Sequence, residues 1–142
     1  MVTASTIRAG AFAALYSLIN SNKVSGSTIL ASYPESNPSF PCVIMPMPQA
    51  EVPDALSLDG TRQYRFTVEF SVWATAAQGQ GQAKVAELLD NLQNTLTTNT
   101  TTLNGHKIKF ESFDPSRVDK VEVNEQKLYT AGAIATFTTY NI

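Results

Sequence analysis

The sequence predicts a single α+β domain, with two helices packed on one face of a sheet of about four strands. The stretch YRFTVEFSVWA, from Tyr64 to Ala74, alternates apolar and more polar residues, which is typical of a strand with one buried face. Two other stretches repeat apolar residues at helical spacing. The length of 142 residues suits one domain, residues 1–142. Most strands are expected to pair antiparallel, but a strand–helix–strand step also allows a mixed sheet.

Both helices are predicted from their apolar stripes. The first covers residues 5–20, and Ser5 or Thr3 can cap its start. The second covers about 80–96. Its stripe consists of Val85, Leu88, Leu89, Leu92 and Leu96. The stretch 94–102 is rich in Thr and Asn, so we expect it to leave the helix and form a polar connection.

Two long loops and two short strands are predicted between the first helix and Tyr64. Residues 20–40 are rich in Gly, Ser, Asn and Pro, with room for one short strand at Ser27–Ala31. The apolar run at Pro41–Met47 is bounded by prolines and is expected to form a short strand at a sheet edge. Residues 48–60 are expected to form the second loop, although Asp59-Gly60 is also a turn signal that can open a hairpin.

The last third of the chain predicts two further strands. The first follows the Asn104-Gly105 turn signal, where Ile108 and Phe110 alternate with charged residues. The second lies in the extended region 121–142. One face of that region carries Tyr129, Ala131, Ala133, Ala135 and Phe137, and the other carries Leu128, Ile134 and Tyr140. Apolar residues on both faces predict a central strand, or one whose outer face meets another subunit.

The composition argues against several classes of function. Charged residues make up 15% of the chain and its net charge is −2, which does not favour a nucleic-acid binder with a basic stripe. Cys42 is the only cysteine and is expected to be a small buried hydrophobe. No run approaches the roughly 20 apolar residues of a membrane span. The start of the chain has no signal-peptide pattern, so we expect synthesis in a cytoplasm and no membrane partner.

The sequence predicts no catalytic, cofactor-binding or metal-binding residue. Gly79-Gln80-Gly81 follows a strand and opens a helix as a dinucleotide-binding loop does, but Lys84 stands where the third glycine is needed. His106 is the only histidine and lies beside a turn signal, so neither a metal-ligand set nor a Cys–His pair is expected. We therefore expect a protein that is not an enzyme and carries no cofactor.

The order and spacing of the elements resemble the tail-terminator and tail-completion proteins of tailed bacteriophages. The length contributes, as does the opening amphipathic helix that leads through a Pro-rich loop to FPCVIM. The strand YRFTVEFSVWA runs into the helix GQAKVAELLDNLQNTL, and IKFESFD is followed by a charged turn and LYTAGAIATFTTY. The resemblance covers nearly the whole chain, and it lies in this order rather than in one motif.

This resemblance implies a structural virion protein. Such a subunit closes into a ring, commonly a hexamer, at the head-proximal end of the tail tube and joins the tail to the neck. The implied partners are other copies of the chain, the tail-tube protein and the neck or connector proteins. A sheath protein joins them if the tail contracts, and DNA only passes through the channel. Assembly would take place in the host cytoplasm.

Two groups of residues are candidates for these roles. Glu51, Asp54 and Asp59 lie in a segment with acids but no Lys or Arg, and we hypothesise that they line the channel and repel DNA phosphates. The alternative is an ordinary solvated loop. The second group is hypothesised to contact neighbouring subunits, through a sheet edge and through the polar face of the long strand. It consists of Val43, Ile44 and Met45 at the edge, and Arg65, Glu69 and Trp73 on the long strand.

Several alternatives stay open. The second helix can simply cover Trp73 instead of leaving it for a partner. The protein can belong to another neck layer, as a head–tail connector or stopper adaptor. It can also be a small non-viral protein-binding module, or an enzyme with a poorly marked site.

Overall fold

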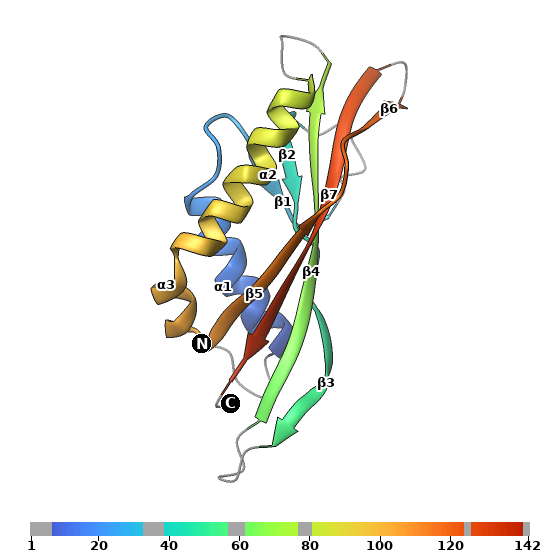
Figure 1. The fold of residues 1–142 in the computed structure, drawn as a ribbon. Helices are drawn as coiled ribbons and strands as arrows, with labels where there is room; N and C mark the ends of the chain where they lie inside the picture. The colour runs from blue at the N-terminus through green and yellow to red at the C-terminus, as the bar shows by residue number, and fades with distance from the viewer. Residues whose placement is uncertain (1–6, 33–38, 57–61, 77–80, 124–125, 141–142) are drawn as a thin grey trace.

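The computed structural model of the chain describes residues 7–32, 39–56, 62–76, 81–123 and 126–140. Within these segments the fold is α+β, as predicted, with one mixed sheet of seven strands and three helices. The elements are α1 (Ile7–Ser21), β1 (Thr28–Leu30), β2 (Cys42–Ile44), β3 (Gln49–Leu56), β4 (Arg62–Thr75), α2 (Gly81–Thr98), α3 (Thr100–Gly105), β5 (Ile108–Pro115), β6 (Asp119–Val123) and β7 (Gln126–Thr139). All three helices lie on the same side of the sheet (Figure 1), so its other face carries no described helix.

Two 14-residue strands, β4 and β7, form the centre of the sheet. They pair antiparallel from Tyr64 opposite Thr139 to Thr75 opposite Leu128. β3 and β2 follow one another along the outer side of β4, and β5 and β6 do the same along β7. β1 pairs in parallel with β2, which makes the sheet mixed. Since β4 and β5 both run antiparallel to β7, α2 and α3 connect two strands that point the same way.

The hydrophobic core fills the space between the sheet and the helices. β4 contributes every second side chain, namely Phe66, Val68, Phe70, Val72 and Ala74. The predicted stripes of the two long helices are buried against them. They consist of Ala11, Ala14, Leu15, Leu18 and Ile19 on α1, and Val85, Leu88, Leu89, Leu92 and Leu96 on α2. The Tyr16 hydroxyl also donates a hydrogen bond to the carbonyl oxygen of Ile29 at 3.0 Å, which ties α1 to β1.

The expectation of a loop over residues 48–60 is wrong for most of that range. Residues Gln49–Leu56 form β3, which pairs antiparallel with the start of β4, as the hairpin alternative allowed. The register shifts on either side of Pro53. A proline is tolerated there because β3 has a described partner on one side only, and an irregular edge strand can leave a ladder position unbonded.

The expected polar connection over residues 94–102 is also wrong. α2 continues to Thr98, and α3 follows at Thr100–Gly105. Hydroxyls of Thr97 and Thr98 donate 2.7 Å hydrogen bonds to carbonyl oxygens four residues earlier, so these side chains are satisfied inside the helix. Leu96 and Leu103 are buried on either side of the break. Burial therefore outweighs the weak helix propensity of threonine here.

The extended region from Val121 divides into two strands, β6 and β7, whose residues Val123 and Gln126 are paired. β7 lies between β4 on one side and β5 and β6 on the other, so the prediction of a central strand is confirmed. None of the described helices combines the length and the apolar character that crossing a bilayer requires.

Candidate assembly surface

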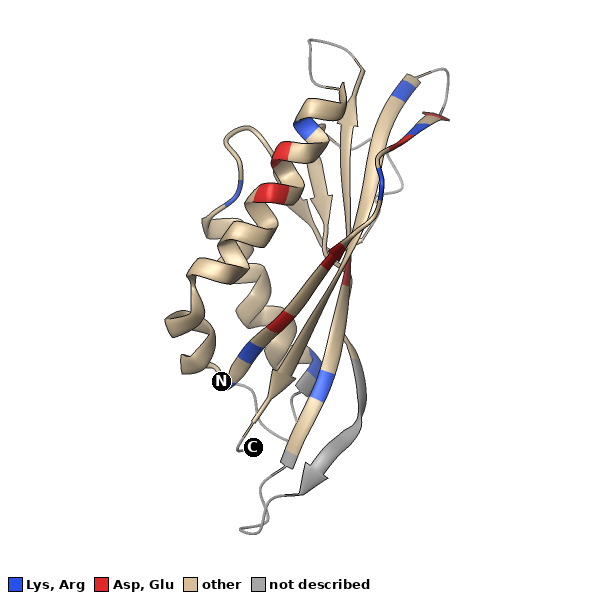
Figure 2. Ribbon diagram, in the orientation of Figure 1, with Lys and Arg blue, Asp and Glu red and all other residues tan. Residues whose placement is uncertain are grey.

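The helix-free face of the sheet consists of the side chains that alternate with the core residues of β4 and β7. On β4, Arg65 and Glu69 are exposed, and Thr67, Ser71 and Trp73 are half-buried. Residues paired directly across two strands share a face, so the β7 partners of these five residues lie on the helix-free face too. The partners are Thr138, Ile134, Thr136, Gly132 and Thr130. The face is therefore largely hydroxyl-bearing, and Figure 2 shows few charged positions along β4 and β7.

The structure places Arg65, Glu69 and Trp73 on this helix-free face. The alternative that α2 covers Trp73 is wrong, because α2 packs on the face that carries Val72 and Ala74. That these three residues contact another subunit stays a prediction.

Trp73 also belongs to a second, smaller buried group on the helix-free face. It is paired with Cys42 on β2 and with Thr130 on β7. Cys42 is 0% exposed and Leu128 is 1% exposed, yet neither belongs to the main core cluster. Since Trp73 is the large side chain next to Cys42, we attribute part of the burial of that thiol to the indole.

The prediction that Val43–Met45 forms a sheet edge is wrong. β2 lies between β1 and β4 and is paired on both sides. Val43 and Met45 point into the main core, where they are 2% and 0% exposed. Ile44 faces the helix-free side but is only 7% exposed. The three-residue β1 covers this edge through a parallel pairing, which the local sequence does not signal.

The candidate acidic loop is partly a strand. Glu51 and Asp54 lie on β3, while Asp59 lies outside the described residues. The hypothesis that these three acids face a DNA channel stays a prediction.

A cleft of about 480 Å³ opens in the middle of the helix-free face. Ser71 and Gly132, which are paired across β4 and β7, line its floor. Ile44 lines one side, and the turn after β5 lines the other. The backbone N–H of Gly132 donates to Ser116 Oγ at 2.8 Å, and the Ser116 N–H donates to the Gly132 carbonyl oxygen at 2.8 Å. These two bonds fix the turn against β7.

Glu69, Ile134 and Asp114 stand in a row beside this floor. Glu69 is paired with Ile134 on β7, and Ile134 is paired with Asp114 on β5. Ile134 is 44% exposed, although it lies near the centre of the sheet. Both carboxylates are exposed, and neither makes a side-chain hydrogen bond or an ion pair within the described part of the chain.

The sequence pattern places Ile134 on an outer face of its strand, but it does not predict Ile134, Asp114 or Gly132 as residues of a site. The available signal was the glycine: Gly132 interrupts an otherwise continuous strand pattern, and such a glycine often marks a close approach.

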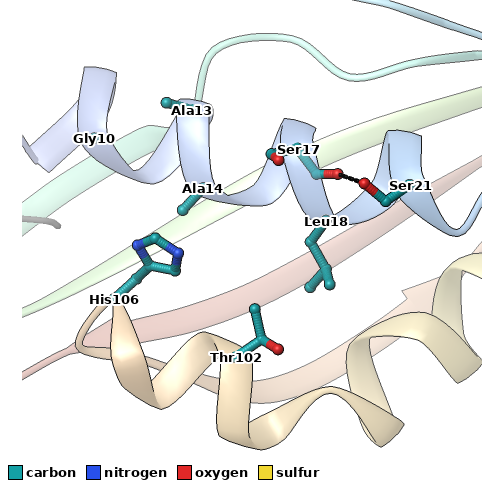
Figure 3. Close-up of a pocket in the computed structure, with 8 residues that line it drawn as sticks. All are labelled: Gly10, Ala13, Ala14, Ser17, Leu18, Ser21, Thr102 and His106. Carbon is teal, nitrogen blue, oxygen red and sulfur yellow. Dashed lines mark hydrogen bonds between the residues drawn. The ribbon is translucent and has the colours of Figure 1, made fainter.

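A second hollow, a groove of about 340 Å³, lies between α1 and α3. Figure 3 shows its lining of mostly small α1 side chains together with Leu18, and the His106 ring pointing toward Ala14 from the end of α3. Among the described residues of this lining, His106 alone is titratable. The Ser21 hydroxyl donates to the Ser17 carbonyl oxygen at 2.8 Å. The described lining residues include no acid, so they do not form a Ser–His–acid set.

Across the described segments, no three His, Cys, Asp or Glu residues come together in a way that could hold a metal ion. No protein-family model matches the sequence, and no curated protein sequence matches it either.

Cys42 is expected to be unreactive in the native protein. Burial raises the pKa of its thiol from the ordinary 9.0 to about 11, so at pH 8 about one molecule in a thousand carries the reactive thiolate. A thiol-specific colour reagent should label no cysteine at pH 8, and one per chain after denaturation in guanidinium. Because the folded state holds this proton more tightly, the thiol should also lower stability as pH rises from 9 to 11. Rapid labelling of the native protein would contradict the burial of this side chain.

Proposed function

We propose that this protein is a structural virion subunit that forms a ring at the head-proximal end of a phage tail tube. The ring ends the tail and joins it to the neck, and DNA passes through its channel. The chain acts through its surfaces and not as an enzyme. Its partners are other copies of itself, with six in a ring, the tail-tube protein and the neck or connector proteins, together with a sheath protein in a contractile tail.

The observation that carries the proposal is the helix-free face of the sheet. A half-covered antiparallel sheet commonly turns a polar face to water. Here that face is polar with few charges, and the exposed Ile134 stands near its centre. Charged residues are depleted at the cores of protein interfaces. The low charge content of the chain, 15%, is consistent with extensive contact surfaces.

The order of the elements gives further support. The elements on which the resemblance rests are the opening helix α1, the short strand β2, the long strand β4 that leads into α2, and the closing long strand β7, and the chain forms them in that order. In the proposed ring, the acidic segment that contains Glu51, Asp54 and Asp59 faces the channel, as hypothesised from the sequence; Glu51 and Asp54 belong to β3.

The test is to measure the mass of the purified protein by light scattering and to image it by electron microscopy, alone and with isolated tail tubes. We expect closed rings, or monomers that assemble on the tube ends. Thr67→Arg should prevent assembly without unfolding the protein, because it places a charge on the helix-free face between Gln49 and Thr136. Thr67→Val, which keeps the size and adds no charge, should assemble normally.

A protein that stays monomeric and ignores tube ends at all concentrations would contradict the proposal. Such a result would favour a small protein-binding module. Binding to a connector protein but not to tail tubes would instead place the protein in another neck layer.

A further inference from the structure

The cleft on the helix-free face has Gly132 in its floor, and the backbone conformation there does not require a glycine. The φ of Gly132 does not lie in the left-handed region that favours glycine. A Cβ added at Gly132 would lie 3.5 Å from the Phe70 carbonyl oxygen and 3.7 Å from Ser116 Oγ, which are ordinary contacts. Glycine weakens the interior of a strand, and it often marks a place where another backbone or a ligand comes close. Without a side chain at Gly132, the floor of the cleft stays open.

The rim of the cleft combines one apolar side chain with two carboxylates. Glu69 and Asp114 lie on β4 and β5, on either side of Ile134 on β7. Two strand spacings separate their backbones by roughly 10 Å. A calcium ion takes 6–8 oxygen ligands, and no group of three His, Cys, Asp or Glu in the described segments could hold a metal ion, so Glu69 and Asp114 do not suit a metal ion. They do suit a long cationic side chain that lies across Ile134.

We propose that this cleft binds an extended segment of another protein, and that the segment presents an Arg or Lys beside an apolar residue. The aliphatic stem of the cation packs on Ile134, and its charged head reaches Glu69 or Asp114. The apolar neighbour enters the space above Ser71 and Gly132. The turn after β5 is already fixed against β7 by the two hydrogen bonds between Ser116 and Gly132. Binding therefore does not have to order this side of the cleft, which lowers its entropic cost.

The choice of a cationic segment follows from charge complementarity. An acidic segment would meet two carboxylates, and a purely apolar one would leave both without a counter-ion. Within the described chain these carboxylates have no cationic partner, so an incoming cation does not have to displace one. The inference rests on the proposed function only for the source of the segment, which would be a neck or tube protein of the same particle.

The test uses an array of synthetic random heptapeptides, probed with the labelled full-length protein. We expect the bound peptides to be enriched in Arg or Lys within two positions of an aliphatic residue or Met. The strongest peptide is then titrated against variants. Gly132→Val, which fills the floor, and the pair Glu69→Gln with Asp114→Asn should each weaken binding about tenfold or more. Thr136→Val, on the same strand and face but outside the cleft lining, is the matched control and should bind normally.

Several results would overturn the inference. These are an array with no binding above background, bound peptides that lack basic residues, and full binding by Gly132→Val. Self-association of the protein that Gly132→Val abolishes would also overturn it, since the occupant would then be a second copy. The array does not depend on ring formation, so failure of the ring proposal and failure of this inference give different results.

Discussion

Replacing Phe137 with alanine is expected to lower the free energy of unfolding by about 3–5 kcal/mol. Phe137 is 0% exposed, and its ring stacks on Phe66 with centroids 5.2 Å apart and planes at 15°. It also contacts Phe110, whose ring centroid is 5.6 Å away. The three residues are paired across β4, β7 and β5. The substitution therefore removes the middle of an aromatic row and leaves a cavity between the strands.

Urea denaturation followed by circular dichroism measures this loss. Domains of this kind are stable by about 5–15 kcal/mol, so the variant should unfold at a much lower urea concentration. Ile134→Ala is the matched control, because it lies on the same strand but on the helix-free face and is already 44% exposed. We expect Ile134→Ala to lower the free energy of unfolding by about 1 kcal/mol or less. Equal losses for the two variants would show that the core does not lie where the structure places it.

Replacing Ile44 with proline is expected to unfold the protein, because β2 is an internal strand of the sheet. Ile44 is paired with Leu30 on one side and with Ser71 on the other. Proline has no N–H and does not fit the interior of a sheet. The substitution leaves a buried carbonyl unpaired and alters the side chain, so the free energy of unfolding should fall by about 3 kcal/mol or more.

Ile44→Ala separates the backbone effect from the side-chain effect, since it keeps the N–H and removes only the apolar side chain. We expect the proline variant to be clearly less stable than the alanine variant in thermal denaturation. If Ile44→Pro gave a cooperative melt like the unchanged protein, β2 could not be an internal strand in solution.

Much of the fold could be predicted from local patterns. Alternation located β4 and β7, and helical spacing located α1 and α2, because each of these elements shows its burial in its own residues. β3 was missed because Pro53 and the acidic residues around it resemble a loop. α3 was missed because threonine favours helices weakly, and only the buried contact of Leu103 shows that a helix forms there.

The candidate site was harder to predict, because it depends on register. The sequence separates Glu69, Asp114 and Ile134 widely, and only the pairing of three strands places them in one row. The prediction that Val43–Met45 forms a sheet edge was wrong for the same reason. β1 is three residues long and pairs in parallel, so no local pattern shows that it covers that side.

The arrangement of the shorter strands has a mechanical consequence. On the β4 side, the pairing with β3 ends at Thr67 and the pairing with β2 begins at Ser71. On the β7 side, the pairing with β6 ends at Thr130 and the pairing with β5 begins at Ala133. The two breaks are offset along the sheet, because β5 still flanks β7 opposite the first break and β2 still flanks β4 opposite the second. Among the described strands, β4 and β7 are the two that run through both breaks. The cleft borders both breaks, so we expect a segment bound there to bridge them and to stiffen the sheet against bending.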